Sequence, residues 1–224
     1  MPGRIVSALV IGIVGCAILV ALGVWQVQRL NWKEAILAEA DGKIFGPAQA
    51  LPEIPDQSRD KYQPVAFSGT SLPEHLLVLT SHKRLGPGFR VIQAFETETR
   101  RILVDRGFVG QDDLPETWPE LELSVKGNIH WPDEIGPFTP EPDIQVGLWF
   151  AREVEAMAAE LGTEPLLVIL AETTPIDPTV TPLPLDTSAI PNDHLQYAAT
   201  WFGLAIVWLA MTLLWMRRIW RGHY

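Results

Sequence analysis

Cysteine is almost absent from the chain: Cys16 is the only one, and it lies inside an apolar run. A single cysteine excludes an intrachain disulfide and any metal site built from several thiolates. The apolar setting of Cys16 also argues against a cysteine nucleophile, because burial among apolar groups disfavours the reactive thiolate. The fold must therefore rest on non-covalent packing.

Sequence motifs of common enzyme classes are missing as well. The chain has no glycine-rich phosphate loop, no His-Glu-x-x-His pair and no Gly-x-Ser-x-Gly elbow. Carboxylates are numerous, but general acid–base catalysis needs a placed pair with shifted pKa values, and carboxylates on an acidic surface are usually solvated. We therefore expect a protein that is not an enzyme.

Acidic residues are absent from both ends of the chain. All 27 Asp and Glu lie within residues 26–194, together with 13 of the 17 Lys and Arg. The basic residues outside that range are Arg4, Arg217, Arg218 and Arg221. Such an acidic middle does not favour nucleic acid as a partner, because phosphate binding needs clustered Lys and Arg.

Two long runs without a charged side chain lie at the ends of the chain, Ile5–Val24 with 20 residues and Leu195–Met216 with 22. At about 1.5 Å per residue, the second run would form a helix of roughly 33 Å, enough to cross a hydrocarbon core of about 30 Å. We therefore expect two transmembrane helices in contact with membrane lipid.

The first apolar run has two alternative interpretations. It could be a cleaved signal peptide, or a lipoprotein signal, since Ile13-Val14-Gly15 before Cys16 loosely fits the pattern of small residues before a lipidated cysteine. The run continues for eight residues past Cys16, which neither alternative needs. Its length favours a retained helix.

The basic residues at the two ends predict the orientation. Arg4 precedes the first helix and Arg217, Arg218 and Arg221 follow the second, so the positive-inside rule places both termini in the cytoplasm. The predicted segments are a cytoplasmic N-terminus (1–4), a first transmembrane helix (5–25), a periplasmic domain (26–193), a second transmembrane helix (194–216) and a cytoplasmic tail (217–224).

The middle of the chain reads mostly as short strands rich in β-branched and aromatic residues, bounded by Gly or Pro. After an extension of the first helix to Asp41–Gly42, we expect turns at Gly86–Gly88 and Thr97–Arg100 and one late helix over 151–162. The expected strands are 62–69, 75–81, 89–95, 101–110, 123–129, 145–150 and 165–170. Closely spaced strands with one late helix predict an α+β domain dominated by an antiparallel sheet or small open barrel.

Small residues recur every fourth position in the first apolar run, at Ala8, Gly12 and Cys16. They could admit a second helix at close range, and Ala199 and Gly203 offer a matching pair on the last helix. The alternative is ordinary lipid-facing composition.

The start of the last helix carries the most informative candidate site. His194 begins a helical stripe that we expect to contain His194, Tyr197, Ala198, Trp201, Ala205 and Trp208. Imidazole is a frequent axial ligand of haem iron, and a porphyrin could lie between this face and the first helix, with Gln26 or Arg29 near its carboxylates. The alternative is that Asn192 or Asp193 caps the helix and His194 lies at headgroup level.

The other histidines have plainer interpretations. His75, His82 and His130 lie at strand ends or beside turns, where surface or capping roles are usual, and His223 belongs to the tail.

Four motifs in order along the chain resemble the Surfeit locus protein family of cytochrome c oxidase assembly factors, also called the Shy family. They are Leu22-Gly23-Val24-Trp25-Gln26-Val27-Gln28-Arg29-Leu30-Asn31-Trp32-Lys33, Gly86-Pro87-Gly88-Phe89, Val104-Asp105-Arg106-Gly107-Phe108-Val109 and Pro191-Asn192-Asp193-His194-Leu195-Gln196-Tyr197-Ala198-Ala199-Thr200-Trp201-Phe202. The chain departs from the family pattern at Phe108, where Trp is common, and at Asp193, where a second Asn is common. The segment Pro132–Gly147 has no counterpart in this resemblance.

The resemblance implies a bacterial inner-membrane protein that takes part in the maturation of oxidase subunit I and binds haem a as a transient cargo. It also implies that His194 is the axial ligand of the haem iron. We expect haem a to arrive from haem a synthase within the bilayer and to pass to cytochrome c oxidase subunit I.

Two other functions compete with this one. The chain could be a cofactor-free membrane scaffold that stabilises oxidase assembly intermediates, in which case His194 would be dispensable. A membrane-anchored hydrolase would need a nucleophile and base that the sequence does not offer.

Overall fold

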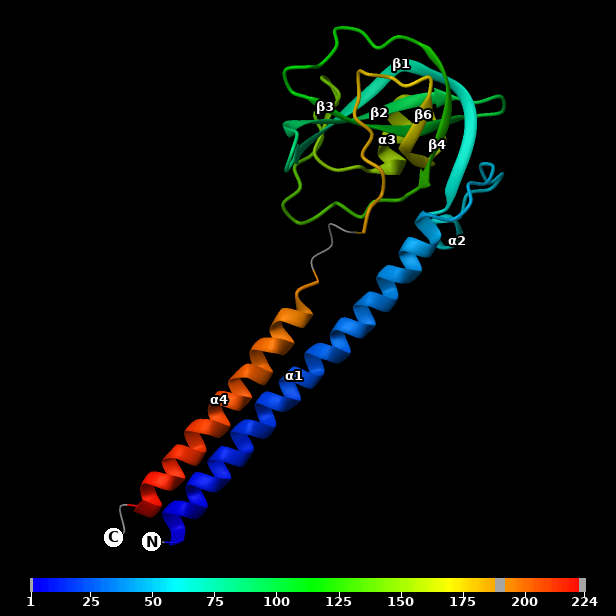
Figure 1. Ribbon diagram of the computed structural model, residues 1–224. Helices are drawn as coiled ribbons and strands as arrows, with labels where there is room; N and C mark the ends of the chain where they lie inside the picture. The colour runs from blue at the N-terminus through cyan, green and yellow to red at the C-terminus, as the bar shows by residue number, and fades with distance from the viewer. Residues whose placement is uncertain (1, 188–191, 222–224) are drawn as a thin grey trace. The chain divides into compact units, whose positions relative to one another are not determined.

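The chain forms two compact units, one made of its two terminal helices and one comprising Ala40–Asp186. The computed structural model describes residues 2–187 and 192–221 (Figure 1). Two apolar helices at the ends flank a domain rich in β-structure, which confirms the predicted fold class.

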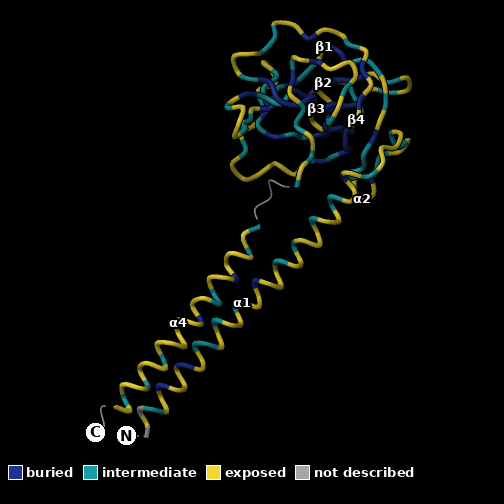
Figure 2. Tube along the Cα trace, in the orientation of Figure 1, coloured by how far each residue is buried: buried dark blue, intermediate teal, exposed yellow. Residues whose placement is uncertain are grey.

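The terminal helices are α1 (Pro2–Ile44) and α4 (His194–Arg221). Both are long and apolar enough to cross a membrane, and only 11% and 6% of their most apolar stretches are buried. Figure 2 shows both helices as mostly exposed with intermediate stretches, whereas the buried residues concentrate in the strands. A core helix of a water-soluble domain would be covered, so these helices match membrane spans in composition and exposure.

Helix α1 continues past the predicted end at Asp41–Gly42 and stops at Ile44. The compact β-rich unit accordingly starts at Ala40, well after residue 26, the expected start of the extramembrane segment. The membrane boundaries themselves stay predictions.

Six strands form one mixed sheet in the order β2-β3-β6-β4-β1-β5, with a further pairing between β1 and β2. Their bounds are β1 Pro64–His82, β2 Gly86–Glu96, β3 Arg101–Gly110, β4 Leu121–Ile129, β5 Leu148–Trp149 and β6 Leu167–Thr174. The β3–β6 and β1–β5 pairs are parallel and the others antiparallel, so antiparallel pairing dominates as predicted.

Strand β1 replaces the two strands that the sequence predicts over 62–69 and 75–81. Its first part pairs with β4 and its second part with β2, which gives the long curved strand of Figure 1. The register with β2 shifts between Ser71 and His75. Pro73 lies inside that shift, and proline, which lacks an N–H, is tolerated in a strand at such a bulge.

The predicted turn at Gly86–Gly88 is also displaced, because these residues belong to β2 and the turn occupies residues 83–85. Gly86 has a φ of 83°, which glycine adopts without strain. The predicted turn at Thr97–Arg100 is confirmed by the hydrogen bond from Thr97 N to Arg100 O at 2.9 Å.

The remaining elements lie close to the positions that the sequence predicts. The prediction for β3 is confirmed at both ends, and that for β4 is confirmed with a start at Leu121. The strand expected over 145–150 shrinks to the two residues of β5, and the one expected over 165–170 runs from Leu167 to Thr174. Helix α3 (Val154–Leu161) ends at Gly162 in the left-handed conformation. A short helix, α2 (Gln57–Asp60), was not expected.

The core lies between the sheet and α3. Helix α3 contributes Val154, Met157 and Ala158, which belong to one cluster with buried side chains from all six strands. Strand β3 is buried along nearly its whole length. A strand covered on both faces reads as a continuous apolar run, which explains why its sequence does not alternate.

An ion pair is buried inside this domain. Arg106 on β3 bonds to Asp177, in the segment after β6, and to Gln93 on β2, while Gln93 donates to the carbonyl of Leu72 in the β1 bulge. Arg106 is 1% exposed and Asp177 8%. Burial lowers the pKa of Arg106, and the charge of Asp177 opposes that shift. The pair therefore fixes the segment after β6 against the sheet.

A second charged network lies beside it. Asp105 is fully buried and accepts hydrogen bonds from Arg90 at 2.7 Å and Arg152 at 3.0 Å. Arg152 also donates hydrogen bonds to Glu134, and Arg90 donates one to the carbonyl of Leu183 at 3.3 Å. Burial acts to raise the pKa of Glu134, but the hydrogen bonds from Arg152 and the charges of Arg152 and Arg90 together lower that pKa.

Gly107 lets the segment after β6 lie directly on β3. Its φ is 108°, and a side-chain carbon here would overlap the carbonyl of Thr181. Phe108 and Thr181 exchange two backbone hydrogen bonds, at 2.7 and 2.8 Å. The Arg106-Gly107-Phe108 motif is thus a structural device that binds the segment after β6.

His130 is half-buried at the end of β4. Its ring stacks on that of Tyr62 at 5.3 Å, and its Nδ1 is buried without a partner among the described residues. Burial, followed by the charge of Arg152, lowers the pKa of His130 to about 4 from 6.5. His130 is therefore part of the packed domain, and the expectation of a surface or capping histidine is wrong.

We predict that Gly107→Ala destabilises the β-rich domain by more than about 2 kcal/mol, through left-handed strain and overlap with Thr181. The matched control is Gly42→Ala in α1, where nothing lies within 4 Å of the added carbon. Alanine there should be neutral or stabilising by up to about 1 kcal/mol. Denaturant unfolding of the full chain in detergent measures both, and equal midpoints for the two variants would refute the assignment.

We predict that the domain loses stability as the pH falls from 6.5 towards 4. In this window the unfolded chain protonates His130 while the folded chain does not, so acid favours unfolding. The loss should be on the order of 1 kcal/mol between pH 7 and pH 5 after allowance for solvent screening. His130→Phe keeps an aromatic ring against Tyr62 and removes the titration. Unfolding midpoints at the two pH values should differ less in this variant than in wild type, and an unchanged difference would contradict the prediction.

Candidate functional site

Close packing between α1 and α4 builds the candidate site. Ala8 and Gly12 of α1 are buried, as the small-residue pattern predicts. A side-chain carbon at Gly15 would overlap the ring of Trp208, and one at Gly23 would overlap the ring of Phe202. Small residues let the helix backbones approach, so large α4 rings rest directly on the α1 backbone.

The prediction that Ala199 and Gly203 form the small pair of α4 at the interface is wrong. Ala199 and Gly203 are exposed, whereas Ala198 and Ala205 are buried at 2% and 5% exposure. Helical periodicity explains the difference, because 198 and 205 share a face with His194 and 199 and 203 do not. The interface is therefore the face that begins at the histidine.

Trp208 strengthens this packing with a hydrogen bond from its Nε1 to the carbonyl of Gly12 at 3.2 Å. Near it, an apolar cavity of about 340 Å³ is lined by residues of both helices, including Cys16, Ala17, Leu209 and Met216. The sulfur of Cys16 thus has an apolar environment, in keeping with an unreactive thiol.

A hydrogen bond joins the two helices at the start of α4. Nδ1 of His194 lies 2.8 Å from Oε1 of Gln26. Gln26 is 9% exposed and His194 is half-buried. The sequence singled out both residues, and the structure brings them into direct contact.

This contact bears on which ring nitrogen of His194 carries the proton. An amide oxygen can only accept, so with Oε1 of Gln26 facing it the neutral ring has its proton on Nδ1. The lone pair of the neutral ring then lies on Nε2, on the far side of the ring from Gln26. That is the arrangement of a ligating histidine, whose second nitrogen is bonded to a polar neighbour.

The other three predicted site residues take no part in the contact between His194 and Gln26. Trp201 is half-buried on the face of His194, while Tyr197 is 55% exposed. The guanidinium of Arg29 lies 4.1 Å from the ring centroid of Trp32 on its own helix. The structure therefore unites His194 with Gln26 and leaves Tyr197 and Arg29 outside that contact.

The capping alternative finds no support at Asn192, whose side-chain oxygen is buried without a hydrogen-bond partner within 2–187 and 192–221. Pro191 of the same motif and His223 of the tail lie outside the described residues.

Among the described residues, no group of three or more His, Cys, Asp or Glu could hold a bare metal ion. His194 offers a single imidazole, which cannot form a metal site alone. Haem iron needs few ligands from the protein. The single imidazole of His194, on a helix face that carries Trp201, would therefore suit haem better than a free metal ion.

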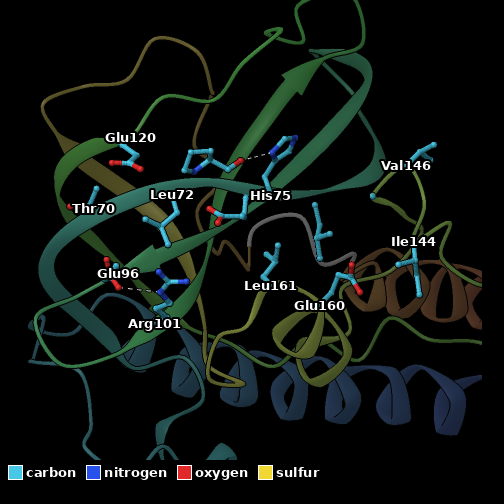
Figure 3. Close-up of a pocket in the computed structure, with 14 residues that line it drawn as sticks. Thr70, Leu72, His75, Glu96, Arg101, Glu120, Ile144, Val146, Glu160 and Leu161 are labelled. Atoms are coloured by element: carbon cyan, nitrogen blue, oxygen red, sulfur yellow. Dashed lines mark hydrogen bonds and ion pairs between the residues drawn. The ribbon is translucent and has the colours of Figure 1, made fainter.

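A second feature lies on the β-rich domain, where a groove of about 980 Å³ follows the β1 bulge (Figure 3). Four glutamates line it, namely Glu74, Glu96, Glu120 and Glu160, and Arg101 pairs with Glu96 at 3.1 Å. Ile144 and Val146 of the 132–147 segment add apolar surface at 56% and 69% exposure. Sequence reasoning missed this groove because residues from distant strands and a long loop form it.

Comparisons with known proteins agree with these motifs. The model of the SURF1 family matches residues 13–206. A SURF1-like protein of Rickettsia felis is 31% identical over 201 residues, covering 84% of this chain and 88% of its own. Surfeit locus protein 1 of Rattus norvegicus is 29% identical over 208 residues, covering 82% and 67%, and that of Homo sapiens is 29% identical over 211 residues, covering 82% and 69%.

The matched range contains both helix segments that form the Gln26–His194 contact as well as the whole β-rich domain. On the strength of that coverage, this chain belongs to the SURF1 family.

Proposed function

We propose that this protein is an assembly factor for cytochrome c oxidase that binds haem a in the membrane and aids its delivery to oxidase subunit I. The observation that carries the proposal is the hydrogen bond between His194 and Gln26. It leaves Nε2 as a free ligand atom on a helix that is long and apolar enough to span a bilayer.

Four residues of this chain would take part in haem binding, in different roles. His194 would supply the ligand nitrogen, and Tyr197 and Trp201 would supply aromatic surface about one and two turns along the same helix. Arg29, one turn beyond Gln26 on α1, would supply a cation for the haem carboxylates. Haem a is the cargo here, and the protein carries out no chemistry on it.

A carrier must release what it holds. A single protein ligand gives modest affinity, so transfer to a subunit that offers a better site can proceed downhill. We propose haem a synthase as the donor and subunit I as the acceptor, both within the bacterial inner membrane.

We propose that the protein is bitopic, with both termini in the cytoplasm and the β-rich domain in the periplasm. The support is the charge distribution, since Arg217, Arg218 and Arg221 follow the second apolar run. In this orientation His194 lies at the periplasmic edge of the bilayer.

A cofactor-free scaffold is the second candidate function. The groove of Figure 3 favours it, because glutamates beside exposed Ile144 and Val146 suit a polypeptide segment that is both basic and apolar. This candidate predicts that oxidase assembles without His194 and fails when the groove is altered.

We predict that His194→Ala lowers the haem a content of the protein purified from cells that make haem a by at least tenfold, because the only axial ligand is removed. The matched control is His75→Ala, since His75 bonds to the carbonyl of Pro73 in the β-rich domain. The absorption spectrum of the purified protein measures bound haem. Equal haem content in His194→Ala and wild type would refute the ligand assignment, and normal oxidase assembly in His194→Ala cells would favour the scaffold.

A further inference from the structure

We infer that Gln26 is a positioning residue for His194: it holds the proton on Nδ1 and turns Nε2 outward as the ligand atom. This inference rests on the proposed function for its consequence at iron. It assigns Gln26 a different role from the one that the sequence suggested, which was contact with haem carboxylates.

The first support is burial. Gln26 is 9% exposed, although it lies on a helix whose surface is largely uncovered. A buried amide in an apolar setting costs free energy unless it is hydrogen-bonded, and the contact recorded for its oxygen is with the His194 ring at 2.8 Å. The bond is therefore the reason a polar residue is tolerated there.

The second support is the packing next to this bond. Gly23, one turn before Gln26, lies beneath the ring of Phe202 on α4. This contact keeps the helices close, and the Gln26 side chain can then reach the imidazole. The direction of the ligand nitrogen thus depends on both helices, although His194 belongs to α4 alone.

The third support is the direction of the bond. Because Oε1 has no proton to give, the neutral ring keeps its proton on Nδ1. A hydrogen bond from Nδ1 also pushes electron density into the ring, which makes Nε2 a stronger donor to iron and favours the oxidised metal. Loss of the acceptor should therefore change both the tautomer and the reduction potential of bound haem.

If Gln26 only joined the two helices, the effect of replacing it would be different. Polar residues often join membrane helices without any effect on a ligand. In that case replacement of Gln26 would loosen the helix pair but would not select a tautomer, so the tautomer is the observable that separates the two roles.

The test compares wild type with Gln26→Leu, which removes the acceptor at similar volume, and Gln26→Glu, which restores an oxygen at the same distance. Gln28→Leu is the matched control, since Gln28 is exposed on the same helix. Nitrogen NMR of the haem-free full chain, labelled with ¹⁵N-histidine, reports which nitrogen of His194 is protonated. The spectra are recorded at an alkaline pH where imidazole is neutral, and His194→Ala assigns the signal.

We expect Nδ1 to be protonated in wild type, Gln26→Glu and Gln28→Leu, and the proton to move to Nε2 in Gln26→Leu. Wild type with its proton on Nε2, or an unchanged tautomer in Gln26→Leu, would overturn the inference.

Loaded with haem a, Gln26→Leu should show a higher reduction potential than wild type, and Gln26→Glu should not. Equal potentials in Gln26→Leu and wild type would also overturn the inference. If wild-type protein takes up no haem a, the proposed function fails instead, and the tautomer comparison still decides whether Gln26 positions His194.

Discussion

The close approach of α1 and α4 is the constraint on which the candidate site depends. Gly12, Gly15 and Gly23 leave room for Thr212, Trp208 and Phe202, and a larger residue at any of these glycines would collide with the facing helix. In lipid no hydrophobic effect drives helices together, so such packing and a few hydrogen bonds must do so. Only at this short separation can Gln26 reach His194, because its side chain must span the gap between two backbones.

The β-rich domain also depends on close packing around a few residues. Arg106, Asp177 and Gln93 form a buried polar cluster, and Gly107 allows the segment around Thr181 to lie on β3. Removing one member of such a cluster leaves an unpaired buried group, which is costly. Arg106-Gly107-Phe108 therefore holds a segment in place, whereas Asn192-Asp193-His194 would present a ligand in the proposed function.

The sequence was sufficient for the helices, for β3 and for the turn at Thr97–Arg100, because charge-free length, apolar runs and turn residues are local signals. It failed at β1, for which two separate strands were predicted, whereas the structure has one strand with a bulge, a feature that only strand partners decide. The face of α4 that meets α1 was harder to predict. The sequence suggested Ala199 and Gly203 as the small pair of the interface, but the buried alanines are Ala198 and Ala205, which the predicted stripe of His194 contains. Gln26 and His194 lie 168 positions apart and carry no local signal of their pairing.

The central claim is that His194 supplies the axial ligand to haem a through a nitrogen that Gln26 leaves free. The most direct measurement is haem a binding to His194→Gly with imidazole added in solution, since free imidazole can occupy the space of the missing ring. We expect the variant to bind little haem a alone and to regain binding with imidazole. Full binding by the variant without imidazole would contradict the ligand assignment, as would a failure of imidazole to restore binding in a variant that unfolds at the same denaturant concentration as wild type.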